Sequence, residues 1–103
     1  MPSYRIVYDV EVRRHLGTID RQYHQLIRET IEQQLKHQPD VETRNRKPLQ
    51  RPASNGADWE LRCGPNNRFR VLYRIADIDE IYVLAIGRKD GNRLVIGGEE
   101  FEL

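Results

Sequence analysis

The sequence predicts an α+β domain in which one strand and two helices precede a three-stranded antiparallel meander, with the helices packed on one face of the sheet. Three observations predict this class. Every second residue from Tyr4 to Val10 is apolar, which is the period of a strand. Apolar residues recur at steps of three and four between Ile19 and Leu35, which is the period of a helix. Three apolar runs separated by turn sequences then follow, at residues 59–63, 69–75 and 81–86.

The first half of the chain is predicted to hold the first strand and both helices. The strand covers residues 4–10, and a short helical turn follows it and ends at Gly17. A longer helix then runs from about Thr18 or Asp20 to His37. Its apolar stripe is expected to face the core and consists of Ile19, Tyr23, Leu26, Ile27, Ile31 and Leu35.

The second half is predicted to be a loop, the meander and a tail. Residues 38–56 contain three prolines and no periodicity, so they are expected to form an extended loop rich in Arg and Lys. The turns of the meander fall at residues 64–67 and 76–80. Both faces of the third run are apolar, so this strand is expected to be central. Because 103 residues leave room for one core, a single domain is expected to span residues 1–103.

Charge is unevenly distributed along the chain, although the net charge is only +1. Residues 44–93 hold 11 basic and 6 acidic side chains, whereas residues 94–103 hold 3 acidic and no basic ones. The basic middle is either a solvated surface balanced by its neighbours or a phosphate-binding surface over which the acidic tail can fold.

Several other classes of protein are excluded by the sequence. No run approaches the roughly 18 consecutive apolar residues of a membrane span, and charges interrupt the N-terminal segment where a signal peptide is apolar. We therefore expect a soluble, cytoplasmic protein with no membrane partner. The single cysteine, Cys63, cannot close an internal disulfide and is expected to be a small buried hydrophobe. The histidines at positions 15, 24 and 37 are expected to be solvent-facing helix residues, so neither a metal nor another cofactor is implied.

Arginines are predicted to gather on the open face of the meander. Arg68, Arg70 and Arg74 alternate with the apolar residues of the middle run, and Arg62 of the neighbouring run can join them. A guanidinium group matches two phosphate oxygens and stays charged, so several converging arginines form a phosphate site. The alternative is that these arginines make ordinary surface ion pairs with Asp58, Glu60, Glu99 or Glu100.

Three segments of the second half carry a resemblance to a known family: Trp-Glu-Leu-Arg-Cys-Gly at residues 59–64, Arg-Phe-Arg-Val-Leu-Tyr-Arg-Ile at 68–75 and Val-Leu-Ala-Ile-Gly-Arg-Lys at 83–89. With this order and spacing, the sequence resembles the RelE/ParE superfamily of toxins from bacterial toxin–antitoxin systems over nearly its whole length. The resemblance implies a RelE/ParE-like fold and a cognate antitoxin protein that silences the toxin. It also implies one of two activities, because RelE-like members enter the ribosomal A site and cleave mRNA, whereas ParE-like members inhibit DNA gyrase.

Between these activities, we expect ribosome-dependent, metal-independent mRNA cleavage, with the ribosome and mRNA as partners. Clustered basic residues suit a phosphate-focused site, for which a gyrase inhibitor has less need. Two alternatives stay open: a ParE-like gyrase inhibitor, and a noncatalytic member that only binds its partner or nucleic acid.

The resemblance also implies roles for individual residues. Arg70 matches the family's arginine in the Arg-Val-X-Tyr segment and Lys89 matches the basic residue after Ile-Gly, so both are expected to stabilise charge at the phosphate, with Arg62 assisting. Glu60 is the candidate general base and Lys47 or Lys89 the candidate general acid. The alternative for Glu60 is a merely exposed strand residue. The expected contacts to the RNA backbone come from Arg44, Arg46, Lys47, Arg68, Arg74, Arg88 and Arg93.

The chain departs from the family pattern at its acid and base. Asp58 and Glu60 stand where RelE-like members carry lysines, Lys47 stands where a neighbouring type has a glutamate, and Val95 replaces a frequent tyrosine. The identity of the acid and base is therefore left open. Arg70, taken as an exposed strand residue, is expected to contribute little to stability.

Overall fold

A computed structural model describes residues 3–103 of the chain. The first part comprises strand β1 (Arg5–Tyr8), helix α1 (Glu11–Leu16), a 3-10 turn η1 (Arg21–Tyr23) and helix α2 (His24–Leu35). The rest is mostly strand: β2 (Arg46–Pro48), β3 (Trp59–Cys63), β4 (Phe69–Asp77), β5 (Glu80–Asp90), β6 (Arg93–Ile96) and β7 (Glu99–Phe101), with a 3-10 turn η2 (Pro65–Asn67) between β3 and β4.

These strands form one seven-stranded sheet. Its order is β2-β3-β4-β5-β6-β7, and all neighbours along this path are antiparallel. Strand β1 lies off the path and pairs in parallel with the first half of β5. Because β5 is 11 residues long, its first half can pair with β1 and its second half with β6.

The predicted fold class is therefore wrong. The molecule is mostly sheet, not one strand, two helices and a three-stranded meander with the helices on one face. Three strands were missed. β2 lies in the segment predicted to be a loop, and it has only three residues, one of them Pro48, which is too few to show a period. β6 and β7 lie in the predicted tail.

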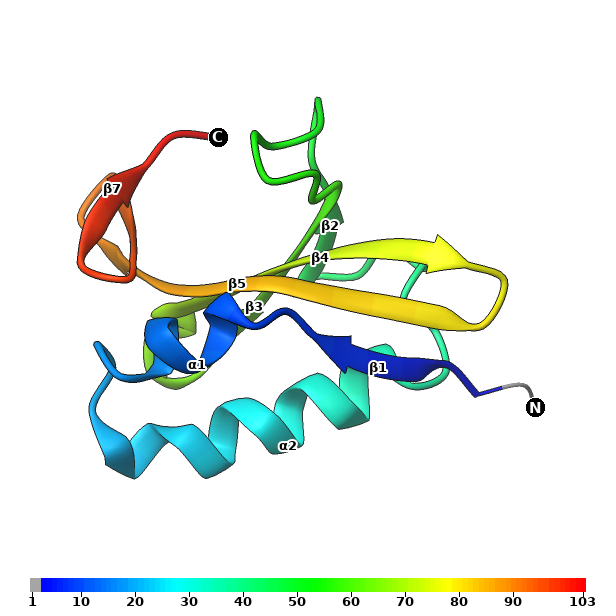
Figure 1. Cartoon of the computed structure of the whole chain (residues 1–103), viewed down its shortest axis with the longest axis horizontal. Helices are drawn as coiled ribbons and strands as arrows, with labels where there is room; N and C mark the ends of the chain where they lie inside the picture. The colour runs from blue at the N-terminus through cyan, green and yellow to red at the C-terminus, as the bar shows by residue number, and fades with distance from the viewer. Residues whose placement is uncertain (1–2) are drawn as a thin grey trace.

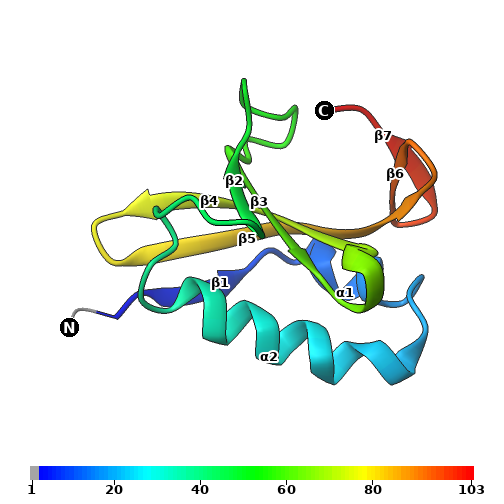
Figure 2. The same cartoon turned by 180° about the vertical axis from the view of Figure 1, so that it is seen from behind.

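The helical part is also smaller than predicted. Helix α1 has six residues and packs against β5, and the regular part of α2 begins only at His24 because η1 precedes it. In Figure 1, α2 runs along one side of the sheet, while the segment between β2 and β3 and the β6–β7 hairpin stand on the other side. Figure 2 shows the same arrangement from behind.

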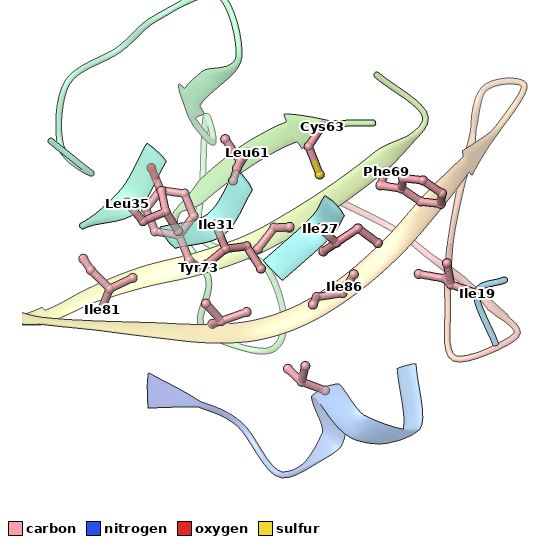
Figure 3. Packing of buried hydrophobic residues seen from close by; sticks show 13 residues of the cluster. Ile19, Ile27, Ile31, Leu35, Leu61, Cys63, Phe69, Tyr73, Ile81 and Ile86 are labelled. Carbon is pink, nitrogen blue, oxygen red and sulfur yellow. The ribbon is translucent and has the colours of Figure 1, made fainter. Parts of the chain in front are cut away.

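The main core lies between α2 and the sheet. Figure 3 shows Ile27, Ile31 and Leu35 of α2 facing the strands that carry Phe69 and Tyr73. Each of these side chains is at most 1 % exposed. The Tyr73 hydroxyl donates a hydrogen bond of 2.6 Å to the carbonyl oxygen of Pro39, so even the polar tip of this core residue is satisfied.

A second, smaller apolar cluster occupies the opposite side of the sheet. It joins Leu72 of β4 and Ala85 of β5 to residues of the β2–β3 segment and of β6. Its buried members are Ala53, Ala57, Leu72, Ala85, Leu94 and Ile96. The face away from α2 is therefore partly covered, and this covering determines which of the predicted site residues reach solvent.

Candidate functional site

Arg70 and Arg62 lie opposite each other on adjacent strands. The alternation along β4 directs Phe69 and Val71 into the main core and leaves Arg70 on the face away from α2. In the register between β3 and β4, Arg62 is the direct partner of Arg70. Two guanidinium groups are thus presented side by side.

Glu60 lies between these two arginines. Its Oε1 accepts a hydrogen bond of 3.2 Å from Arg62 Nε, and its Oε2 lies 3.7 Å from Arg70 Nε. Glu60 is only 8 % exposed, so the alternative that it is an exposed strand residue is wrong. Its carboxylate balances two positive charges in a partly desolvated place. We name Glu60, Arg62 and Arg70 the Glu–Arg cluster.

Arg70 is buried, contrary to the expectation of an exposed side chain, because only 9 % of it is accessible. Its Nη1 donates a hydrogen bond to the carbonyl oxygen of Asn67, which lies in η2 with a positive φ of 52°. Burial lowers the pKa of Arg70 while Glu60 raises it, and an arginine stays charged after such a change. The guanidinium is therefore held from two sides in one orientation.

Gly87 is a site residue that sequence analysis did not single out. It is the register partner of Arg70 on β5, and a Cβ added there would lie 2.5 Å from the carbonyl oxygen of Val95. β6 thus approaches β5 closely beside Arg70. A glycine inside an apolar strand is the sequence signal for such an approach.

The two candidate lysines flank the Glu–Arg cluster. Lys47 on β2 is the register partner of Glu60, and its Nζ lies 3.7 Å from Glu42 Oε2. Lys89 on β5 lies two residues beyond Gly87, on the same side of the strand and partly exposed. Among residues 3–103, neither lysine forms a hydrogen bond or ion pair with the cluster, so both border it rather than belong to it.

Arg46 lies on the other face, although it was predicted to contact RNA. It is 6 % exposed, and its guanidinium donates to the carbonyl oxygens of Val41 and Gln34 at 3.0 and 2.6 Å. Gln34 lies in the last turn of α2, where carbonyl groups lack partners within the helix. Arg46 thus closes the end of α2 and lies outside the cluster.

The other arginines predicted to contact RNA are spread over the surface. Arg74 lies on the same face as Arg70, with its guanidinium carbon 5.3 Å from the ring centre of Tyr82. Arg93, which was predicted to contact RNA, forms an ion pair with Glu100, with 3.2 Å between Arg93 Nε and Glu100 Oε1. Arg44 and Arg68 are exposed, and Arg88 is partly exposed opposite Phe69, which places it on the α2 side.

Asp58 is a further carboxyl group, and it immediately precedes β3. Its N–H donates to the carbonyl oxygen of Tyr73 at 3.1 Å, although the register partner of Tyr73 is Trp59, so the strand alternation does not extend to Asp58. Its Oδ1 is buried and has no hydrogen-bond partner within residues 3–103. Burial raises the pKa of Asp58, and the charge of Arg74 offsets part of this effect.

The remaining titratable candidates, Cys63, His15 and His24, are buried or partly buried. Cys63 is 4 % exposed, as predicted for a small buried hydrophobe, and burial raises its pKa to about 11. The prediction for His15 is wrong, because this residue is buried and its Nδ1 accepts the N–H of Ile86 at 3.3 Å. His24 is partly buried and its Nε2 lies 2.9 Å from the carbonyl oxygen of Ile19.

Comparison with known proteins adds no identification. No protein-family model matches the sequence, and no curated protein is significantly similar to it. In the part of the chain that the structure describes, no three His, Cys, Asp or Glu side chains gather to hold a metal ion. Over the same residues, no helix is long and apolar enough to cross a membrane.

Proposed function

We propose that this protein is a RelE/ParE-like toxin that acts in the cytoplasm and cleaves mRNA in the ribosomal A site without a metal ion. Two lines support the proposal: the resemblance in residues 59–64, 68–75 and 83–89, and the Glu–Arg cluster on the face away from α2. The observation that carries it is the direct pairing of Arg62 with Arg70 across one carboxylate.

Such a pairing is hard to explain by stability alone. Like charges directly opposite each other destabilise a sheet, and burying an arginine adds a desolvation cost. The negative charge of Glu60 offsets both the repulsion and the desolvation cost. Apolar residues at positions 60, 62 and 70 would avoid the two costs altogether. Two guanidinium groups held by a rigid sheet are preorganised to bind the oxygens of a phosphate.

The proposed reaction is attack of a ribose 2′-hydroxyl on the adjacent phosphate. Glu60, held between its two arginine partners, accepts the proton of the attacking hydroxyl. Arg62 and Arg70 stabilise the negative charge that develops on the phosphate oxygens. Lys47 and Lys89, which flank the cluster, contact the neighbouring RNA backbone.

The proposed partner is a cognate antitoxin, and a groove between α1 and α2 suits it. The groove has a volume of about 1080 Å³, and its lining combines apolar side chains such as Val12, Leu16 and Ile31 with charged and polar ones. Val10 also lines it and is 87 % exposed, which leaves an aliphatic side chain in solvent. An amphipathic antitoxin helix would bury both the apolar side chains of the groove and the side chain of Val10.

Induction in bacteria tests the proposed function. We expect growth to stop on induction, to continue when the adjacent open reading frame is co-expressed, and primer extension to find new mRNA 5′ ends at A-site codons. Arg21→Ala, which changes an exposed arginine on the helical side, is expected to behave like the wild type. Relaxed plasmid DNA with intact mRNA would instead indicate gyrase inhibition, and undisturbed growth would indicate a noncatalytic member.

A further inference from the structure

A second cleft lies between helix α1 and the β6–β7 hairpin, and it differs from the groove that α1 forms with α2. Its volume is about 260 Å³. Leu84 and Ala85 of β5, Ile96 of β6 and Phe101 of β7 form its apolar lining. Asn55 of the β2–β3 segment also lines it, and Figure 1 shows this segment on the same side of the sheet as the hairpin. The cleft therefore offers an apolar wall to a bound side chain.

Carboxylates also line this cleft. They belong to Asp9, Glu11, Glu99 and Glu100. Arg14 pairs with Glu11 at 2.9 Å, and Arg93 pairs with Glu100 at 3.2 Å. Neither Asp9 nor Glu99 has an ion pair within residues 3–103. The cleft therefore keeps a negative charge that a cation can meet.

A buried histidine adds a hydrogen-bond donor. His15 lines the cleft, is 5 % exposed, and accepts the Ile86 N–H at its Nδ1. Because a backbone N–H only donates, the neutral ring carries its proton on Nε2. Burial lowers the pKa of His15 and favours this neutral form. Within residues 3–103, Nε2 has no hydrogen bond, and the buried side-chain atom without a partner is Asp58 Oδ1, so Nε2 is open to the cleft.

These features fit an arginine side chain together with the peptide that carries it. A guanidinium group is a planar cation that stacks on an aromatic ring and binds carboxylates with two parallel hydrogen bonds, whereas an ammonium group is a compact point charge. Phe101 supplies a ring, and Glu99 supplies a carboxylate on the same strand. The His15 Nε2–H needs an acceptor, which a peptide carbonyl group supplies. A phosphate is disfavoured because the carboxylates repel it.

We propose that the cleft between α1 and the β6–β7 hairpin is a docking site for an arginine side chain in an extended segment of a partner protein. The aliphatic stem lies along Leu84 and Ile96, and the guanidinium group lies against Phe101 and binds Glu99. A carbonyl oxygen of the same segment accepts the His15 Nε2–H. The inference goes beyond the proposed RNA cleavage and does not rest on it.

The test is a titration of the full, isotope-labelled chain by NMR with two peptides that differ only in charge. The probe is acetyl-Gly-Ala-Arg-Ala-Gly-amide, and the control peptide carries citrulline, a neutral isostere, in place of its arginine. We expect the arginine peptide to shift the backbone amide signals of Ile86 and Phe101 and the Nε2–H signal of His15. We expect it to bind about tenfold more tightly than the citrulline peptide, and free arginine to bind more weakly because it lacks the peptide carbonyl groups.

Two variants of the chain locate the binding site. Glu99→Gln removes a carboxylate from the exposed strand β7, and Asp9→Asn removes another while its amide oxygen can still accept the Glu11 N–H. We expect each to bind the arginine peptide about threefold more weakly at an unchanged melting temperature. Glu102→Gln makes the same change of charge at an exposed residue outside the cleft lining, and it is expected to bind like the wild type.

Four results would overturn the proposal. Equal binding of the arginine and citrulline peptides would remove the role of charge, and equal binding of free arginine would remove the role of the peptide. Wild-type affinity in both Glu99→Gln and Asp9→Asn would place the peptide elsewhere. A chain that sediments as a dimer, with the signals of the cleft perturbed by dilution, would assign the cleft to a second copy of this chain.

Discussion

At the scale of single residues, the burial of Arg70 couples activity to stability. Removing it leaves the Asn67 carbonyl without its donor and Glu60 with one arginine partner instead of two. We therefore expect Arg70→Ala to lower the free energy of unfolding by about 2 kcal/mol, measured by urea denaturation, in addition to abolishing toxicity. Arg62→Ala, whose side chain is 36 % exposed, is expected to lower it by less than about 1 kcal/mol. Equal stability of Arg70→Ala and the wild type would contradict the structural part of this account.

His15 gives a second prediction at this scale. Burial lowers its pKa, and its Nδ1 must be unprotonated to accept the Ile86 N–H. As the pH falls below about 6.5, the unfolded chain takes up a proton at this residue before the folded chain does, so the contribution of His15 to stability is lost toward acid pH. We expect the melting temperature to fall less between pH 7.5 and 5.5 in His15→Asn, whose amide oxygen can accept the same N–H. An identical fall in both proteins would show that His15 does not carry this dependence.

Strand alternation is sufficient to predict which side chains share a face, but not how deeply each is buried. It predicts that Arg62 and Arg70 point away from the residues that pack on α2. It does not predict that Arg70 and Glu60 are almost inaccessible, because nearby cover comes from η2 and from segments distant in sequence. Arg46 shows the same limit, since a three-residue strand has no readable period and its partners lie in α2 and the following loop.

At the scale of elements, segments with a local period were located, and short strands without one were missed. The part of the predicted stripe from Leu26 to Leu35 lies in α2, and the three apolar runs lie within β3, β4 and β5. The hairpin of β6 and β7 was missed because its strands are only four and three residues long. Its turn is formed by Gly97 and Gly98, with φ of 62° and 85°. These short strands form through pairing with β5 rather than through a local pattern.

Gly87 tests how closely β5 and β6 must approach beside the Glu–Arg cluster. In Gly87→Ala the new Cβ would lie 2.5 Å from the Val95 carbonyl oxygen and 2.6 Å from Ile96 Cγ1, so the backbone of β6 must move. We expect a loss of about 1–3 kcal/mol in unfolding free energy. The comparison is Gly17→Ala, where the nearest atom is 3.3 Å away and the loss should be smaller. A neutral effect of Gly87→Ala would contradict the close approach.

At the scale of the whole molecule, the two proposed sites lie apart. The Glu–Arg cluster lies on the face away from α2, whereas the groove lies between α1 and α2. If the proposed function holds, we expect antitoxin binding and RNA cleavage to depend on different residues, so that one can be changed without the other.

Val10→Glu tests this separation. Because Val10 is 87 % exposed, the substitution is expected to leave folding and mRNA cleavage unchanged. A charge at the rim of the apolar groove is expected to weaken antitoxin binding at least tenfold, measured by titration calorimetry with the purified product of the adjacent open reading frame. Unchanged affinity would show that the antitoxin binds elsewhere.

The central claim is that the Glu–Arg cluster cleaves mRNA, and its most direct test is the rate of mRNA cleavage on purified ribosomes with a defined A-site codon. We expect one cut within that codon by the wild-type chain, and a rate about 100-fold lower for Arg62→Ala at unchanged melting temperature. The Arg21→Ala control is expected to cut at the wild-type rate. An Arg62→Ala chain that cuts as fast as the wild type, or a wild-type chain that leaves the mRNA intact, would contradict it.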